Sequence, residues 1–389
     1  MIINLDKLFY RIIFTFPLTT LFQSYFEGIN KVIFGLLIFL LLLKYRKVRK
    51  SIILVVIILS IVYVFTIYKT GTIPYNINEL FYFPFAILYL IYMGNHIRQV
   101  QDYLALDKKY IKNIICIWTI LVIISFFIPS SYTIEWGEAR YFGSYCQSIW
   151  RLAPTCIFIL TFSIIGITFY KERKYIIFSV VPFICLLAGG SRTYMLVGII
   201  LLIIAWYYYL DSKTKWYLSI IPFLTILVLI ILNSSMVDKI AATTFSANSY
   251  FDFWGTLTSG RSIFWEADIN SFFQSNFINK LVGQGFNAIY EINWQAFGGK
   301  VWAHNDFIQC LISHGILGLG IYLYSIVSLY TIVWKRKKDF FPKFAIILVW
   351  FVNAMFNMFY TYFCSILSFP FLIIAVYQKD IDALKNQKN

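Results

Sequence analysis

A histidine, an asparagine and an aspartate stand together where a long apolar run begins. They are His304, Asn305 and Asp306, in the stretch VWAHNDFIQCLISHGILGLGIYLY that covers residues 301–324. An imidazole with an unperturbed pKa of about 6.5 can accept a proton from a hydroxyl nucleophile, so His304 is a candidate catalytic base. In the alternative interpretation, Asn305 and Asp306 cap a helix and His304 is an interfacial bystander.

Two arginines occur where an anion could bind. Arg192 follows a Gly-Gly-Ser sequence that ends one helix and begins the next. An arginine in a first turn opposes the helix macrodipole, whereas a phosphate there would be stabilised by the guanidinium, the free N–H groups and the dipole together. Arg261 follows a Ser-Gly pair in LTSGRSIFW, and the same argument applies more weakly. The alternative for Arg192 is snorkelling to lipid headgroups.

Two further arginines have simpler explanations. Arg140 follows Glu135 and Glu138, so a local salt bridge competes with substrate binding. Arg151 is explained by anchoring the start of an apolar segment. The sequence has no HExxH, CxxC or outer DxD motif, so it predicts neither a metal site nor a cofactor. The GQG sequence at residues 283–285 is too short to indicate a phosphate loop and equally suits a turn.

The composition places these residues in a membrane. Of 389 residues, 60% are hydrophobic and 13% charged, against about 25% charged in soluble domains. Apolar windows of about 20 residues, the length that crosses a bilayer, recur throughout. The sequence predicts an all-α polytopic protein with about twelve spans: 9–26, 28–43, 51–68, 77–94, 112–128, 149–170, 175–190, 192–210, 216–233, 306–333, 343–359 and 361–377. The six cysteines are expected to pack as small apolar residues.

The basic residues predict the orientation of the spans. With the amino terminus in the cytoplasm, the inner segments hold 24 of the 33 Lys and Arg residues, and nine fall outside. This bias follows the positive-inside rule, so the net charge of +15 reports topology and not a nucleic-acid partner. Both termini are then expected in the cytoplasm.

The expected organisation has one large extracytoplasmic loop. A transmembrane bundle of nine spans occupies residues 1–232, the loop 233–305, three further spans 306–377 and a cytoplasmic tail 378–389. The loop is rich in aromatic residues, unlike a disordered linker. It is expected to contain short helices, one of them beginning after Ser259 and running through GRSIFWEADINSFF.

The ordered motifs resemble the O-antigen polymerase and ligase superfamily of membrane glycosyltransferases. The segments are GGSRTYML at a span boundary, then SGRSIFW, VGQGFNAIY and WAHNDFIQCLISHGILGLGIYLY, within residues 189–323. The resemblance implies a helical fold related to the GT-C class and a substrate of sugars carried on undecaprenyl diphosphate. His314 departs from the family, which often has an acidic residue before the following glycine.

The resemblance also implies roles for matched residues. Arg192 and Arg261 would grip the diphosphate, and His304 would activate or position the acceptor hydroxyl. Arginines and a histidine can supply charge neutralisation and a base without metal. Further candidates for binding the substrate are Arg140, Asn305, Trp265 and Trp302. Sugar stacking by Trp254, Trp265, Trp294 and Trp302 competes with interface anchoring.

We therefore predict a metal-independent polymerase of capsular or other surface polysaccharide in a bacterial cytoplasmic membrane. Its partners would be the lipid-linked oligosaccharide, the bilayer, a chain-length regulator and a flippase. A ligase shares the donor chemistry and differs only in its acceptor. A transporter of lipid-linked sugars should show inverted repeats and midplane charges, which the sequence lacks. A scaffold protein would tolerate changes at Arg192, Arg261 and His304.

Overall fold

The computed structural model describes residues 5–45, 50–71, 74–134, 140–210, 212–232, 258, 260–334 and 340–385. Within these residues the fold is helical, and its sheet is a small antiparallel pair in which Tyr132 lies opposite Phe142. The all-α class predicted from the sequence is therefore confirmed for this part of the chain. Residues 233–257, Trp254 among them, lie outside the described residues.

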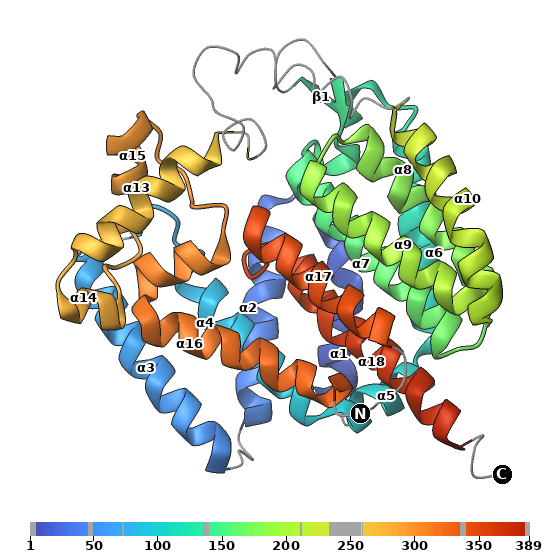
Figure 1. Ribbon diagram of the computed structural model, residues 1–389, viewed down its shortest axis with the longest axis horizontal. Helices are drawn as coiled ribbons and strands as arrows, with labels where there is room; N and C mark the ends of the chain where they lie inside the picture. Colours follow the sequence, from blue (N-terminus) through green and yellow to red (C-terminus); the bar gives the residue numbers. More distant parts are fainter. Residues whose placement is uncertain are drawn as a thin grey trace.

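The helices and strands follow in the order shown in Figure 1. They are α1 (Leu5–Leu21), α2 (Glu27–Lys44), α3 (Lys50–Thr70), α4 (Glu79–Asn95), α5 (Ile97–Leu106), α6 (Lys108–Ser125), β1 (Tyr132–Ile134), β2 (Arg140–Phe142), α7 (Ile149–Thr168), α8 (Val180–Ala188), α9 (Arg192–Leu210), α10 (Lys213–Leu232), α13 (Arg261–Gln274), α14 (Phe277–Val282), α15 (Ala288–Phe297), α16 (Asp306–Trp334), α17 (Phe340–Phe356) and α18 (Phe363–Lys385). Short 3₁₀ turns occur at Pro129–Ser131, Ser144–Cys146 and Arg173–Ser179.

Fewer helices than expected are long and apolar enough to cross a membrane. By length and composition, the described residues contain five such helices, in α3, α7, α9, α10 and α16, or six if α4 and α5 form one span bent by 82°. The expectation of twelve spans is not confirmed. Three charged residues each in α2 and α6 interrupt their apolar windows, and α8 has only nine residues because a 3₁₀ turn precedes it. The last apolar stretch does divide into α17 and α18.

The bundle is built around α7, whose residues are nearly all buried. Helix α7 packs against α18, α9, α8 and α1, and Phe162 lies between Phe14 of α1 and Phe371 of α18, with ring centroids 4.9 and 5.4 Å apart. Both termini lie at one end of this bundle, while α13 and α15 lie at the opposite end (Figure 1). We call this opposite end the loop end.

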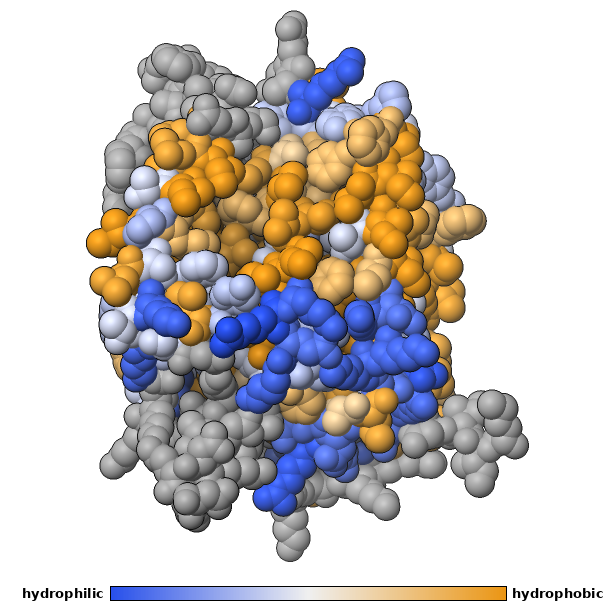
Figure 2. Space-filling view, turned by 90° about the vertical axis from the view of Figure 1, so that its right-hand side faces the viewer, coloured by the Kyte–Doolittle hydropathy of each residue, from blue (hydrophilic) through white to orange (hydrophobic). Residues whose placement is uncertain are grey.

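The surface of the bundle is divided between apolar and polar regions. Figure 2 shows hydrophobic residues across the upper part of one face and hydrophilic residues gathered below them, toward the end with the termini. Large apolar side chains are exposed along α3 and α10, where Leu54 is 62% and Ile221 72% exposed. Contiguous exposed apolar surface of this kind suits contact with lipid.

A break in α16 receives the turn that follows α14. Gly315 has φ +68° and ψ −170°, so it interrupts the helix. The turn at Gly283 fills this break: a Cβ on Gly315 would lie 2.5 Å from the Gly283 nitrogen, and Gln284 N donates to Ile312 O at 2.7 Å. The GQG sequence is thus a packing turn. A small apolar core around Phe272, Ile289 and Ile312 completes the contact of α13, α15 and α16.

Candidate active site

Three predicted residues, Arg192, Arg261 and His304, come from segments far apart in the sequence. Arg192 is the first residue of α9, and Arg261 is the first residue of α13. Helix α13 begins there because Gly260 adopts a left-handed conformation, φ +81°, which glycine tolerates. The helix expected after Ser259 is therefore confirmed.

The carboxyl end of α17 joins the two arginine segments. The Nη1 group of Arg261 donates a hydrogen bond to the carbonyl oxygen of Phe356, and Thr193 Oγ1 donates to the same oxygen at 3.4 Å. Thr193 directly follows Arg192. The starts of two helices thus meet at one carbonyl, and each start carries an arginine. The positive end of the dipole at each helix start favours an anion beside it.

Arg261 is a buried cation beside a second cation. Burial is the main reason that the pKa of Arg261 falls to about 10, the charge of Arg192 acts in the same direction, and Tyr362 opposes the shift. The guanidinium remains charged at neutral pH even so. Because the charge of Arg192 lowers the pKa of Arg261, the two guanidinium groups lie within electrostatic reach of each other and repel. An anion placed there would relieve both the repulsion and the desolvation.

His304 belongs to the same electrostatic neighbourhood. Burial, helped by the charge of Arg261, lowers the pKa of His304 to about 3. Its backbone has φ +50°, a left-handed conformation that is uncommon outside glycine and that clusters at functional sites. Among the described residues, buried Nδ1 of His304 has no hydrogen-bond partner. An unpartnered, neutral imidazole nitrogen is available to accept a proton.

Trp265 and the amino end of α16 fix the position of this histidine. Trp265 Nε1 donates to Ala303 O at 2.5 Å. On the other side, Asn305 Oδ1 accepts from Phe307 N at 2.9 Å and from Ile308 N at 3.1 Å, so Asn305 caps α16. The capping interpretation therefore holds for Asn305, whose amide also contacts Met355 Sδ at 3.3 Å.

Asp306 has a different role from the cap that was the alternative expectation. Its buried carboxylate accepts hydrogen bonds from the Tyr322 hydroxyl and from Phe359 N, the latter at 3.1 Å. It thereby ties α16 to the connection between α17 and α18. The unpartnered histidine His304, the cap residue Asn305 and Asp306 are thus consecutive in the sequence.

The remaining predicted residues are distributed around this centre. Arg140 is exposed on β2, and the glutamates expected to pair with it lie outside the described residues. Trp294 is 51% exposed on α15. His314 is buried in α16, where its ring stacks on Phe83 with centroids 3.9 Å apart and its Nδ1 lies 3.1 Å from Thr66 Oγ1, so it packs within the bundle.

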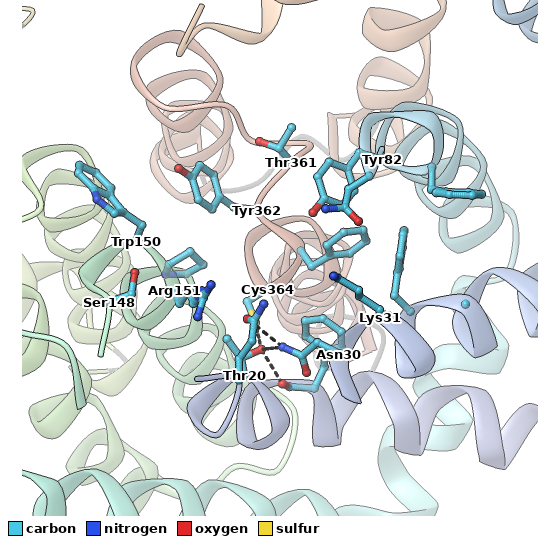
Figure 3. A pocket seen from close by; sticks show the side chains of 18 of the residues that line it. Thr20, Asn30, Lys31, Tyr82, Ser148, Trp150, Arg151, Thr361, Tyr362 and Cys364 are labelled. Atoms are coloured by element: carbon cyan, nitrogen blue, oxygen red, sulfur yellow. Dashed lines mark hydrogen bonds between the residues drawn. The ribbon is translucent and has the colours of Figure 1, made fainter. Parts of the chain in front are cut away.

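A cavity at the loop end contains residues that the sequence reasoning missed. It has a volume of about 670 Å³ and lies between α1, α2, α4, α7 and the start of α18 (Figure 3). Its lining includes Asn30, Lys31, Tyr82 and Tyr362 together with the predicted Trp302. Lys31 is one of the nine basic residues expected on the outer side of the membrane. Its position on that side could have marked it as a candidate.

The comparisons with known proteins address the segment that holds the arginines and the histidine. Residues 177–323 match the family model described as O-antigen ligase. This segment is therefore similar to the O-antigen ligase family. The matched segment contains Arg192, Arg261 and His304 and covers less than half of the chain, and its position agrees with the resemblance found in residues 189–323. It supports a glycosyl-transfer activity of the ligase or polymerase type. No curated protein matches the chain.

Proposed function

We propose that the protein is a polymerase that joins oligosaccharide units carried on undecaprenyl diphosphate at the outer face of a bacterial cytoplasmic membrane. The observation that supports this proposal is that Arg261 and Thr193, the residue after Arg192, donate to one carbonyl, with His304 within electrostatic reach of Arg261. Two cations and a neutral base are what transfer from a lipid diphosphate requires. The product would be capsular or another surface polysaccharide.

The reaction uses the three side chains in distinct roles. The acceptor hydroxyl oxygen forms a bond to the anomeric carbon of the donor sugar, and the bond from that carbon to the diphosphate oxygen breaks. The diphosphate leaves with the electron pair, and Arg192 and Arg261 neutralise its charge. The hydroxyl proton passes to His304. A bound diphosphate offsets the charge of Arg261 and so makes the imidazole a stronger base at this step. No metal ion is needed.

The direct test is polymer formation by the purified chain. Supplied with lipid-linked repeat units from its source bacterium, the parent should produce a ladder on a gel. Arg192→Ala and His304→Ala should abolish it. Lys280→Ala is the matched control: Lys280 lies in the last turn of α14, outside the segments that carry Arg192, Arg261 and His304, so its ladder should persist.

Two results would contradict the proposal. If the ladder survives in both His304→Ala and Arg192→Ala, the site is elsewhere. If the parent makes no ladder but transfers the glycan to a separate acceptor, the enzyme is a ligase, the function named in the description of the matched family.

A further inference from the structure

The cavity of about 670 Å³ is distinct from the arginine pair, since neither arginine lines it. We infer that it is a second substrate site, which holds the acceptor unit by an anionic group and by sugar hydroxyls. This inference rests on the proposed function, because only an enzyme that joins two saccharides needs a second site. Its volume falls within the range of about 300–1,000 Å³ typical of ligand pockets.

Two cations face the cavity from opposite walls. Lys31 comes from α2, and Arg151 comes from the first turn of α7, where its Nη1 donates to Ser24 Oγ at 3.5 Å. Figure 3 shows both side chains directed into the space between these helices. The lining residues include no aspartate or glutamate. The cavity is therefore cationic, and an anion is the complementary ligand.

A buried amide offers a place for a sugar hydroxyl. Asn30 is only 8% exposed, and its Nδ2 donates to Gln23 Oε1 at 3.0 Å. Among the described residues its Oδ1 has no hydrogen-bond partner. A buried acceptor without a donor is costly, and a ligand hydroxyl in the cavity would supply one. The aromatic rings of Tyr82, Trp150 and Trp302 provide flat apolar surfaces in the wall of the cavity.

The cavity adjoins the reaction centre. Trp302 lines the cavity and lies two residues before His304. Tyr362 lines it from the other side, while its ring lies 5.9 Å from that of Tyr194 in α9 and its hydroxyl interacts electrostatically with Arg261. Tyr362 and Trp302 thus connect the wall of the cavity to the surroundings of Arg261 and of His304. Its sugar chain can extend from the cavity toward His304.

The anion beside Lys31 and Arg151 has two chemical sources. It is either the diphosphate of the acceptor lipid or a carboxylate on an acidic sugar. Equilibrium binding to the full chain in nanodiscs separates them with two probes, undecaprenyl diphosphate and a lipid-free tetrasaccharide of glucuronic acid. Since binding requires no turnover, failure of the polymerase proposal would not affect this measurement.

The charge-removing variant is the double substitution Lys31→Met with Arg151→Met, and the matched control is Lys280→Met. If the cavity binds the diphosphate, we expect the parent to bind two equivalents of undecaprenyl diphosphate. If it binds the acidic sugar, we expect the parent to bind one equivalent of the glucuronate. In the double variant, the equivalent bound in the cavity should bind about ten-fold or more weakly. Loss with the first probe assigns the diphosphate, and loss with the second assigns the acidic sugar. Unchanged binding of both probes would overturn the inference.

A steric variant tests the same site without removing a charge. Gly35 lines the cavity, and a Cβ on it would meet nothing within 4 Å. Gly35→Leu should therefore fold and reduce binding of the same probe that the double variant reduces. If Gly35→Leu binds both probes as the parent does, the cavity is not the site.

Discussion

At the scale of single residues, His304 depends on contacts that its own sequence neighbourhood does not contain. Its left-handed backbone is held between the Ala303 carbonyl, bound by Trp265, and the Asn305 cap. Its chemistry is set by burial and by Arg261, some forty residues earlier in the sequence. The sequence indicated His304 as a base. Its low pKa could not be predicted, because the burial of His304 and the position of Arg261 at the start of α13 are set by the fold.

The pKa of His304 determines the pH dependence of the free enzyme. Because burial and Arg261 lower this pKa to about 3, the imidazole stays neutral between pH 5 and 8, and kcat/KM should show no acid limb there. A histidine of ordinary pKa, about 6.5, would lose about thirty-fold in activity by pH 5. The measurement is kcat/KM against pH in the parent. A fall with its midpoint near 6.5 would refute the assignment.

The same shift has a consequence for stability. The folded-state pKa lies below the unfolded value, so neutral His304 contributes stability that is fully present above about pH 6.5 and is lost as the pH falls toward 3. Lowering the pH from 7.5 to 5 should therefore reduce the melting temperature in detergent less for His304→Gln than for the parent. Equal losses would contradict the burial of this group.

Asn305 can be assigned to capping or to substrate binding by two substitutions. Aspartate retains the oxygen that accepts from Phe307 N and Ile308 N, whereas alanine removes it. We expect Asn305→Ala to lose about 1 kcal/mol of unfolding free energy and Asn305→Asp to lose little. Polymer output should follow stability in both. An Asn305→Asp chain that is stable but inactive would indicate contact with substrate.

At the scale of elements, the start of a helix was easier to predict than its course. The beginnings of α9, α13 and α16 carry local turn and capping residues, and the expected positions agree with Arg192, Arg261 and Asp306. The break at Gly315 depends on a contact from elsewhere in the fold, the turn at Gly283. Glycines are frequent within apolar helices, so the sequence did not mark Gly315 as the one that receives the turn at Gly283.

The break in α16 should be sensitive to a single methyl group. In Gly315→Ala, the Cβ would lie 2.5 Å from backbone atoms of Leu281 and Gly283, at a φ that L-residues rarely adopt. We expect a loss of about 3 kcal/mol or more, measured by thermal unfolding in detergent. Gly320→Ala in the same helix meets nothing within 4 Å and should be neutral or slightly stabilising. Similar melting temperatures for the two variants would contradict the packing described.

At the scale of the whole molecule, the distribution of basic residues predicted which segments face the cytoplasm and which side of the membrane carries the candidate site. The termini share an end of the bundle, and α13, whose first residue is Arg261, lies at the other (Figure 1). Which end faces outward is a prediction from the basic residues. The cavity itself could not be predicted, because it is assembled from five separate helices and from residues of the segments between helices, Trp302 among them.

Labelling of single cysteines in intact cells tests this orientation. Helix α15 lies at the loop end (Figure 1), and Gln295 on it is exposed, whereas Lys215 is exposed in the first turn of α10, between spans where the sequence predicts a cytoplasmic segment. An impermeant maleimide should label Gln295→Cys in intact cells and Lys215→Cys only after lysis. The reverse pattern would place the loop end in the cytoplasm and exclude an outer-face polymerase.

The central claim is that the arginines hold the diphosphate while His304 acts in the transfer. The most direct measurement is undecaprenyl diphosphate binding together with its release from lipid-linked repeat units, in the parent, Arg261→Ala and His304→Ala. Our account predicts one release per linkage formed in the parent, weakened binding in Arg261→Ala, and parental binding without release in His304→Ala. Parental release by His304→Ala, or undiminished diphosphate binding by Arg261→Ala, would contradict it.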